Sequence, residues 1–488
     1  MTDLTLPTID FAIVAQPAVV FAWAMLLLLV DLFVDNKRAV GAVALLGTLV
    51  AAGVGVALWG RSGTTFGGMI TLDNYGLLFN LIFLGVAALT ILISLDYLPR
   101  HSIERGEYYV LILLATGGMM LLSQGTDLIV LFLGLELLSI TLYVLAGFAY
   151  PRLASEEAAM KYLLVGAFAA GFLVFGIALV FGATGESNLA AINDYLSRQT
   201  LVAESQTLLL IGAALVIAGF GYKIAMAPFH MWTPDVYEGS PTPVAAFMSV
   251  GTKAAGFAAL TRFLQVALPT QQEIWVPILG ALAALTMLVG NITAVTQLNV
   301  KRMLAYSSIG HAGYLLLGTL SLGGAGGRGV EGLLFYTVAY ALTNLAAFAV
   351  LITLERRGEA AWSLDSFAGL WHRQPWLAVA MAVCMLSLAG VPPTAGFWGK
   401  FYVFTAAWQA GLAWLALVGV LTSAIAAFFY LRIVAIMFMR EPEGEREPRL
   451  SGGLSVGIGL ATAAILLIGI VPAPVIDLVQ SSVLALGR

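Results

Sequence analysis

Six ionisable residues interrupt long apolar runs of this chain. They are Glu136, Lys161, Lys223, Lys253, His311 and Lys400. Each of these side chains can take up and release a proton. Lysine suits this task because burial and neighbouring charges readily change its protonation. The set therefore predicts a row of titratable sites along which protons pass.

Composition places these residues in a membrane protein. Of the 488 residues, 60% are hydrophobic and 10% are charged, whereas soluble domains carry about 25% charged residues. This predicts a polytopic membrane protein. The single cysteine, Cys384, lies in an apolar run. The sequence thus offers no disulfide framework and no cysteine ligand set for zinc or an iron–sulfur cluster.

Runs of about 20 mostly apolar residues predict an all-α fold with about 14 transmembrane helices. The segments are about 11–34, 39–60, 75–95, 108–124, 127–149, 157–183, 206–232, 242–266, 274–297, 302–322, 330–354, 375–410, 411–438 and 453–479. The twelfth is too long for one straight span. The longest polar gaps, at 184–205, 355–374 and 439–452, predict ordinary loops.

Basic residues predict the orientation. Most of those in short loops follow odd-numbered segments: Lys37, Arg38, Arg100, Arg105, Arg152, Lys301, Arg302, Arg356, Arg357, Arg373, Arg440, Arg446 and Arg449. Cytoplasmic loops carry an excess of Lys and Arg, so we expect both termini on the outer side. Residues 1–10, "MTDLTLPTID", hold no basic residue and do not resemble a signal-peptide n-region.

Two predicted helices contain helix breakers. The seventh carries Pro228, and the twelfth carries Pro392 and Pro393. Proline removes a backbone donor, and a broken helix is tolerated at membrane depth where protein or water satisfies the freed groups. The breaks lie five helices apart, and paired breaks in inverted repeats mark a transport path. Coincidental kinks are the alternative.

These breaks predict the domain organisation. It comprises three N-terminal helices in 1–105, a first five-helix repeat in 106–268, a second, inverted repeat in 269–438, and a C-terminal helix in 439–488. Helices 4–8 form the first repeat and helices 9–13 the second, with helices 7 and 12 discontinuous.

Depth in the membrane separates the candidates. At 1.5 Å per residue, Glu136 lies at least ~12 Å from either end of its helix and Lys253 lies ~15 Å deep. A charge at the bilayer centre costs at least ~2.5–3.5 kcal/mol, so it is a functional candidate. A carboxylate about 4 Å from a lysine contributes about 4 kcal/mol at an effective dielectric near 20. Making or breaking such a contact would switch a buried lysine between its charged and neutral forms.

Each candidate also has a structural interpretation. Lys253, which is too deep to reach the interface, can belong to an ion pair that the sequence does not reveal. Lys161, near its helix start, can extend to the interface. Glu136 and Lys223 can form an ion pair that holds two helices together. Lys400 can cap carbonyls freed by the helix break, and His311 can be a neutral packing residue.

Four stretches resemble a known family. They are "LFLGLELLSI", "GYKIAMAPFHMWTPDVYEGSPTPVAAFMS", "NVKRMLAYSSIGHAGY" and "AGVPPTAGFWGKF". They resemble the antiporter-like membrane subunits of respiratory NADH–quinone oxidoreductase (complex I) and of multisubunit cation/proton antiporters. The resemblance covers about 110–435. The family has L-, M- and N-type subunits. The chain length and the motif "YSSIGHAGY" are similar to those of the N-type subunit. The M-type has a glutamate at the position of Lys400.

The resemblance implies roles for the candidate residues. It implies that Glu136 pairs with Lys223, that Lys253 is the central lysine of helix eight, and that Lys400 lies near the outlet. All six ionisable residues are implied to form a proton relay around a hydrophilic axis between the two inverted repeats.

The resemblance also implies a function and partners. The chain would translocate protons in the membrane arm of NADH:quinone oxidoreductase, coupled to quinone reduction in partner subunits. FMN, iron–sulfur clusters and quinone would belong to those partners, with no cofactor in this chain and no nucleic acid. Other membrane-arm subunits, including other antiporter-like ones, and the lipid of a prokaryotic inner membrane would surround it. The alternatives are a subunit of a multisubunit Na⁺/H⁺ antiporter and a non-conducting scaffold held by structural ion pairs.

Overall fold

The computed structural model describes residues 9–198, 202–321, 328–355, 362–442 and 450–483. Within these ranges the chain forms nineteen α-helices and one short two-stranded ribbon, which confirms the all-α class. The helices are α1 (Ala15–Phe33), α2 (Lys37–Ala57), α3 (Asn74–His101), α4 (Glu107–Gln124), α5 (Leu128–Ala146), α6 (Leu153–Thr184), α7 (Leu189–Arg198), α8 (Ala203–Lys223), α9 (Trp232–Gly239), α10 (Thr242–Arg262), α11 (Gln272–Val295), α12 (Val300–Leu320), α13 (Arg328–Leu354), α14 (Leu370–Arg373), α15 (Pro375–Ala389), α16 (Ala395–Gln409), α17 (Ala413–Met439), α18 (Gly452–Ile470) and α19 (Ala473–Gln480).

The predicted segments coincide with these helices. Every segment lies on one helix or on a pair of consecutive helices. Eleven helices of the described ranges are long and apolar enough to cross a membrane. The helices α4 and α12 are not among the eleven, and α15 and α16 are too short to qualify. The chain is therefore a multi-pass membrane protein, whereas the count of fourteen spans and the inverted repeats stay predictions.

The two predicted helix breaks are present. The helix α8 ends at Lys223, and the chain resumes as α9 only at Trp232. Likewise, α15 ends at Ala389 and α16 begins at Ala395. Each break opens a helix end inside the bundle, where backbone groups need new partners.

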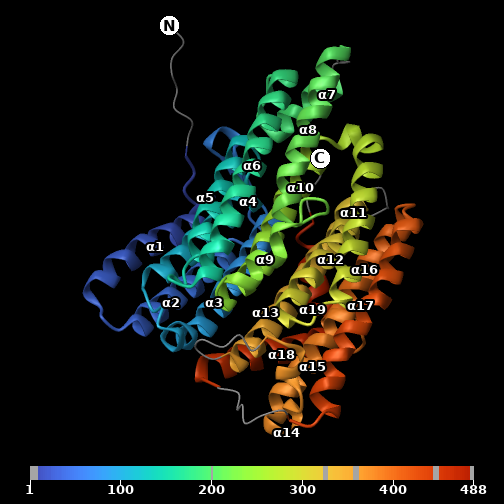
Figure 1. Ribbon diagram of the computed structural model, residues 1–488. Helices are drawn as coiled ribbons and strands as arrows, with labels where there is room; N and C mark the ends of the chain where they lie inside the picture. Colours follow the sequence, from blue (N-terminus) through green and yellow to red (C-terminus); the bar gives the residue numbers. More distant parts are fainter. Residues whose placement is uncertain (1–8, 199–201, 322–327, 356–361, 443–449, 484–488) are drawn as a thin grey trace.

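The helix α10 is the most enclosed helix of the bundle. All of its residues are buried, and it packs against α3, α4, α8, α12 and α13. Figure 1 shows it between the N-terminal helices (blue) and α15–α17 (orange). Because protein surrounds α10, a polar side chain on it meets protein groups and not lipid.

Three elements differ from the sequence prediction, one of them the short helix α14, which lies in the gap 355–374 predicted as a loop. An antiparallel ribbon, β1 (Gly63–Thr65) and β2 (Ile70–Leu72), follows α2. Its turn uses Gly67 and Gly68, whose positive φ angles of 66° and 87° suit glycine. The gap at 184–205, predicted as an ordinary loop, contains the amphipathic helix α7.

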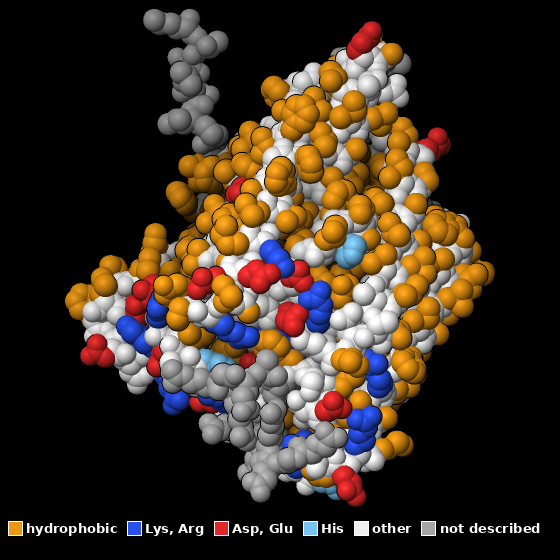
Figure 2. Space-filling model, in the orientation of Figure 1, with side chains coloured by type: hydrophobic (Ala, Val, Ile, Leu, Met, Phe, Trp, Pro, Cys, Tyr) orange, Lys and Arg blue, Asp and Glu red, His pale blue; other side chains and the backbone are white. Residues whose placement is uncertain are grey.

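Loops that follow odd-numbered segments meet at one end of the bundle. Lys161 and Arg302 both bind Asp235 there, and we call this the charged end. At the opposite end, Arg262 binds Asp73. Figure 2 shows charged side chains gathered over the middle and lower part of one face, with hydrophobic ones above.

Some residues of the orientation argument lie outside the described residues. They are Arg356, Arg357, Arg446 and Arg449, together with residues 1–8 of the N-terminal stretch.

Candidate functional site

Lys223 ends α8 at the first helix break and is 1% exposed. Its Nζ donates to Ser139 Oγ on α5 at 2.8 Å and to Tyr162 Oη on α6 at 3.1 Å. Trp232, at the start of α9, stacks on the Tyr162 ring and donates its indole N–H to the Tyr222 carbonyl. Aromatic side chains therefore pack around the first helix break, and the hydrogen-bond partners of Lys223 are uncharged hydroxyl groups.

Glu136 lies one helical turn before Ser139 on α5 and is half-buried. One of its oxygens is buried without a hydrogen-bond partner, and Glu136 forms no ion pair within 4.0 Å in the described part of the chain. The structure therefore does not bring Glu136 and Lys223 into the predicted pair. The hydroxyl of Ser139 takes the place expected for the carboxylate.

Lys253 lies in the middle of α10 and is 1% exposed. Its Nζ donates to the backbone carbonyl of Ser308 on α12 at 2.5 Å. The Ser308 hydroxyl accepts from Tyr340 Oη at 2.8 Å, and Tyr340 belongs to α13. Lys253 therefore binds a backbone carbonyl of α12, beside the hydrogen-bonded hydroxyls of Ser308 and Tyr340.

His311, on α12, is 2% exposed and is bonded through both ring nitrogens. Nδ1 lies 2.6 Å from Tyr336 Oη, and Nε2 lies 3.0 Å from Tyr430 Oη. The Tyr430 hydroxyl also bonds Ser307, and the Tyr340 ring lies 4.9 Å from the imidazole. A histidine with a hydroxyl at each nitrogen can take a proton on one side and release one on the other.

Lys400 lies at the second break and is 5% exposed. Its Nζ donates to Ser423 Oγ at 2.6 Å and to the carbonyl of Ala389, the last residue of α15, at 3.0 Å. It also stands 5.0 Å from the ring centroid of Tyr314. Lys400 thus caps a freed carbonyl, as the structural interpretation expected, and contacts a buried tyrosine as well.

Lys161 does not join the buried set. Its side chain is 44% exposed and pairs with Glu157 at 2.7 Å and Asp235 at 2.9 Å. These groups belong to the charged end, in agreement with the interpretation that Lys161 extends to the interface.

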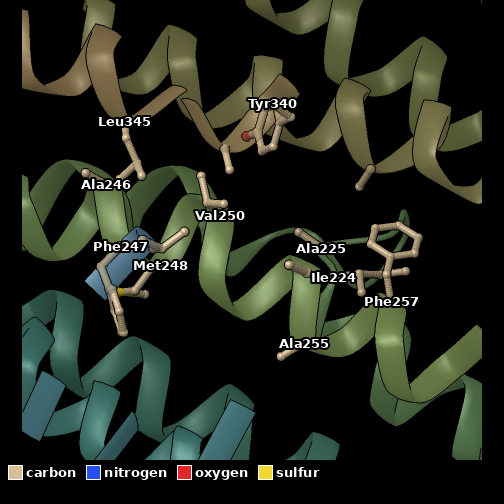
Figure 3. Close-up of a cluster of buried hydrophobic side chains, with 14 of the residues drawn as sticks. Ile224, Ala225, Ala246, Phe247, Met248, Val250, Ala255, Phe257, Tyr340 and Leu345 are labelled. Atoms are coloured by element: carbon tan, nitrogen blue, oxygen red, sulfur yellow. The ribbon is translucent and has the colours of Figure 1, made fainter. Parts of the chain in front are cut away.

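We call Lys223, Lys253, His311 and Lys400 the buried row. From Lys253 to Lys400, tyrosine and serine side chains lie beside its members, through ring contacts as well as hydrogen bonds. Between Lys223 and Lys253 the described residues form no hydrogen-bonded link. Ile224 and Ala225, which follow α8, and Phe257 on α10 belong to a buried apolar cluster (Figure 3). The row therefore contains an apolar interruption after Lys223.

A second buried charged cluster lies at the charged end and was not predicted. Glu355 is 2% exposed and accepts from the Thr242 hydroxyl and from Trp362 Nε1. Lys301 is fully buried, with its Nζ 4.2 Å from the Trp362 ring. Arg152 lies 5.3 Å from the same ring. The cluster joins the start of α10 to the end of α13.

Sequence reasoning missed the hydroxyl partners of the row. Tyr162, Tyr336, Tyr340 and Tyr430 are each 3% exposed or less. The only signal was the presence of tyrosine within apolar segments, which is common and does not say which helices meet. Glu355 directly precedes two arginines, and such a cluster of charges is typical of an exposed loop, so the sequence did not indicate that Glu355 is buried.

The fold and the buried row together define a class of membrane protein. A multi-pass helix bundle with two discontinuous helices and buried lysines beside the breaks is an antiporter-like ion-translocating subunit.

Comparison with known proteins narrows this class. The family model described as "NADH:quinone oxidoreductase/Mrp antiporter, TM" matches residues 125–426. NADH-quinone oxidoreductase subunit N 2 of Roseiflexus castenholzii is 62% identical over 99% of this chain and 98% of its own length. Subunit N of Chloroflexus aggregans is 61% identical, with both chains covered in full. A chain of respiratory complex I from Thermus thermophilus with bound aureothin has a TM-score of 0.82 at 36% identity, over 96% of this chain and 99% of that chain.

The chain belongs to the NADH:quinone oxidoreductase/Mrp antiporter family of membrane subunits. The resemblance that the sequence motifs indicated, including its N-type character, is confirmed.

Proposed function

We propose that this chain is a proton-translocating membrane-arm subunit of NADH–quinone oxidoreductase, in which the buried row carries the protons. The observation that supports this most is the burial of Lys223, Lys253, His311 and Lys400 beside hydroxyl groups. The similarity to proteins named NADH-quinone oxidoreductase subunit N extends over the whole chain. It supports the assignment of the buried row to that enzyme complex.

Hydroxyl groups explain how a proton moves along the row. Serine and tyrosine hydroxyls both donate and accept, so they relay a proton along hydrogen bonds. Because a backbone carbonyl cannot relay a proton, the proposed path from Lys253 passes to the Ser308 hydroxyl, which bonds Tyr340, and past the Tyr340 ring to His311. The tyrosines around His311 lead on to Tyr314, whose ring faces Lys400.

Because of the apolar interruption between Lys223 and Lys253, we infer that Lys223 acts on the row through its charge and does not pass protons directly to Lys253. Without a hydrogen-bonded link, the two lysines influence each other through charge. Charges interact more strongly in a low-dielectric interior than in water. A change at Lys223 thus alters whether Lys253 keeps its proton, and Lys223 acts as a control point of the row.

The proposal includes the surroundings of the chain. NADH oxidation and quinone reduction, with FMN and iron–sulfur clusters, take place in partner subunits. Other membrane-arm subunits, including antiporter-like ones, are the neighbours. The charged end faces the cytoplasm by the positive-inside rule, and both termini face the outer side of a prokaryotic inner membrane.

A test replaces Lys253 with methionine, which keeps the length and removes the proton site. The intact complex is reconstituted in vesicles, and NADH:quinone reductase activity, proton uptake and assembly are measured. We expect normal assembly and proton pumping lowered about tenfold or more, equivalent to at least about 1.4 kcal/mol. Lys37→Gln is the control, because Lys37 is partly exposed and pairs with Asp31 at the end of α1. Normal pumping by an assembled Lys253→Met complex would remove Lys253 from the path.

The alternatives make different predictions. A scaffold held by structural ion pairs would give the buried lysines carboxylate partners, but Lys223, Lys253 and Lys400 are bonded to hydroxyls and carbonyls. A Na⁺/H⁺ exchanger subunit would purify from native membranes with small hydrophobic exchanger subunits and no reductase activity. Purification with flavin and iron–sulfur subunits and with reductase activity supports the proposed function.

A further inference from the structure

Arg432 is an intramembrane cation that the buried row does not use. It lies on α17, two turns before the helix ends at Met439. Its Nη2 donates to the Gln297 carbonyl at 2.6 Å, just beyond α11. Its Nε is buried and has no hydrogen-bond partner among the residues that the structure describes. Leaving a charged donor buried and unpaired is costly, so the site calls for an external acceptor.

A cavity of about 630 Å³ adjoins Arg432 at the charged end. Its lining includes Leu298, Asp365, Arg432, Ile436, Met439 and Arg440. Arg440 pairs with Asp365 at 3.1 Å. This pair balances one positive charge and leaves that of Arg432 in excess, so the cavity favours an anion.

The rim of the cavity is apolar and exposed. Leu298 is 70% exposed and Met439 86%. Since α17 is long and apolar enough to span a membrane, these side chains lie where the helix leaves the bilayer. A free anion would gain nothing from such a rim. A ligand with an anionic head and an apolar body would use both parts of the site.

We propose that this cavity, the Arg432 pocket, binds the phosphate of an anionic phospholipid from the surrounding bilayer. Arg432 and Arg440 hold the headgroup, and the acyl chains lie along the exposed face of α17. Basic pockets between helices on the cytoplasmic side are suited to anionic headgroups.

The pocket has a structural consequence. Its walls come from α17 and from the strand-like pairing of Asn299 with Ser363, next to the Leu364 N–H bond to Leu298. This pairing precedes α12, which carries His311. A bound headgroup therefore ties α17 to the start of α12 and stabilises that end of the bundle.

Native mass spectrometry of the intact complex tests the proposal. The delipidated complex is titrated with phosphatidylglycerol and, separately, with phosphatidylcholine. We expect the wild type to retain phosphatidylglycerol, and Arg432→Gln to bind one copy fewer or about tenfold more weakly, the loss expected for one charge-assisted hydrogen bond. Arg38→Gln is the matched control, because Arg38 is an exposed arginine whose partner is Asp96.

Three outcomes would overturn the proposal. These are equal retention of both lipids, equal loss in the Arg38→Gln complex, and displacement of the lipid by millimolar inorganic phosphate. The last would make the site one for free phosphate. If the Arg432→Gln complex does not assemble, Arg440→Gln on the rim and the lipid selectivity of the wild type decide the matter. None of these readouts depends on proton pumping.

Discussion

The partners of Lys223 show what kind of site this buried lysine occupies. Ser139 and Tyr162 accept hydrogen bonds from its ammonium group. By rotating, the same hydroxyls can donate to a neutral amine. A carboxylate partner would favour only the protonated form. Hydroxyl partners therefore allow Lys223 to change its protonation without losing its contacts, as a residue in a proton path requires.

Glu136→Gln tests the residue scale. The substitution removes a half-buried negative charge near Lys223 but breaks no ion pair, because Glu136 forms none within 4.0 Å among the described residues. We expect full assembly on native gels and a three- to tenfold loss of pumping, from a charge effect of about 1 kcal/mol. Glu204→Gln is the control, since Glu204 is exposed in the first turn of α8. Failure to assemble would favour the scaffold, whereas unchanged pumping would show that Glu136 plays no part in the path.

At the scale of elements, the second helix break depends on a single glycine. Gly390 follows α15 with a φ angle of 86°. A Cβ at this position would lie 2.8 Å from Lys400 Cδ. Glycine therefore permits both the left-handed turn that ends α15 and the passage of Lys400 towards the Ala389 carbonyl.

Gly390→Ala should displace Lys400. The left-handed conformation alone costs about 1–2 kcal/mol for a residue with a side chain, and the new methyl group presses on the lysine stem. Gly411→Ala is a matched control, because Gly411 has a φ angle of 80° and nothing within 4 Å of the added Cβ. We expect both variants to lower the melting temperature of the complex, but only Gly390→Ala to reduce pumping severalfold. Equal pumping in the two variants would argue that Lys400 does not need its present position.

The elements show which features the sequence can predict. Mean hydropathy located the helices because a span must be apolar along its whole length. Pro228, Pro392 and Pro393 located the breaks because proline cannot continue the hydrogen-bond ladder. The partners of the lysines come from other helices, and their choice depends on packing that one sequence does not encode locally. Glu136 and Lys223 make no direct ion pair for this reason, since Ser139, one turn along α5, is the residue whose side chain contacts Lys223.

At the scale of the whole molecule, α10 passes from the charged end through the centre to the opposite end. Its first residue, Thr242, bonds Glu355, its middle carries Lys253, and its last residue, Arg262, binds Asp73. The helix is thus tied to α13 at one end and to the N-terminal helices at the other. These contacts at both ends fix the position of Lys253 along the α10 axis relative to Ser308 on α12.

Glu355→Gln tests whether the charged end holds α10 in place. The change keeps the size but removes the charge that faces Thr242, Trp362 and the nearby Lys301. Because two hydrogen bonds to a buried carboxylate are weakened, we expect about 3 kcal/mol of destabilisation. Hydrogen exchange at residues 242–246 should become faster, together with a lower melting temperature of the complex.

Asp194→Asn supplies the comparison, because Asp194 pairs with Arg198 on the exposed surface of α7. Such a pair contributes only about 0–1 kcal/mol, so that variant should melt and exchange like the wild type. Faster exchange confined to the start of α10 in Glu355→Gln would mean that the buried cluster anchors the helix that carries Lys253. Exchange and melting unchanged in both variants would mean that apolar packing alone sets the position of α10, and that the carboxylate of Glu355 is dispensable for holding the two predicted repeats together.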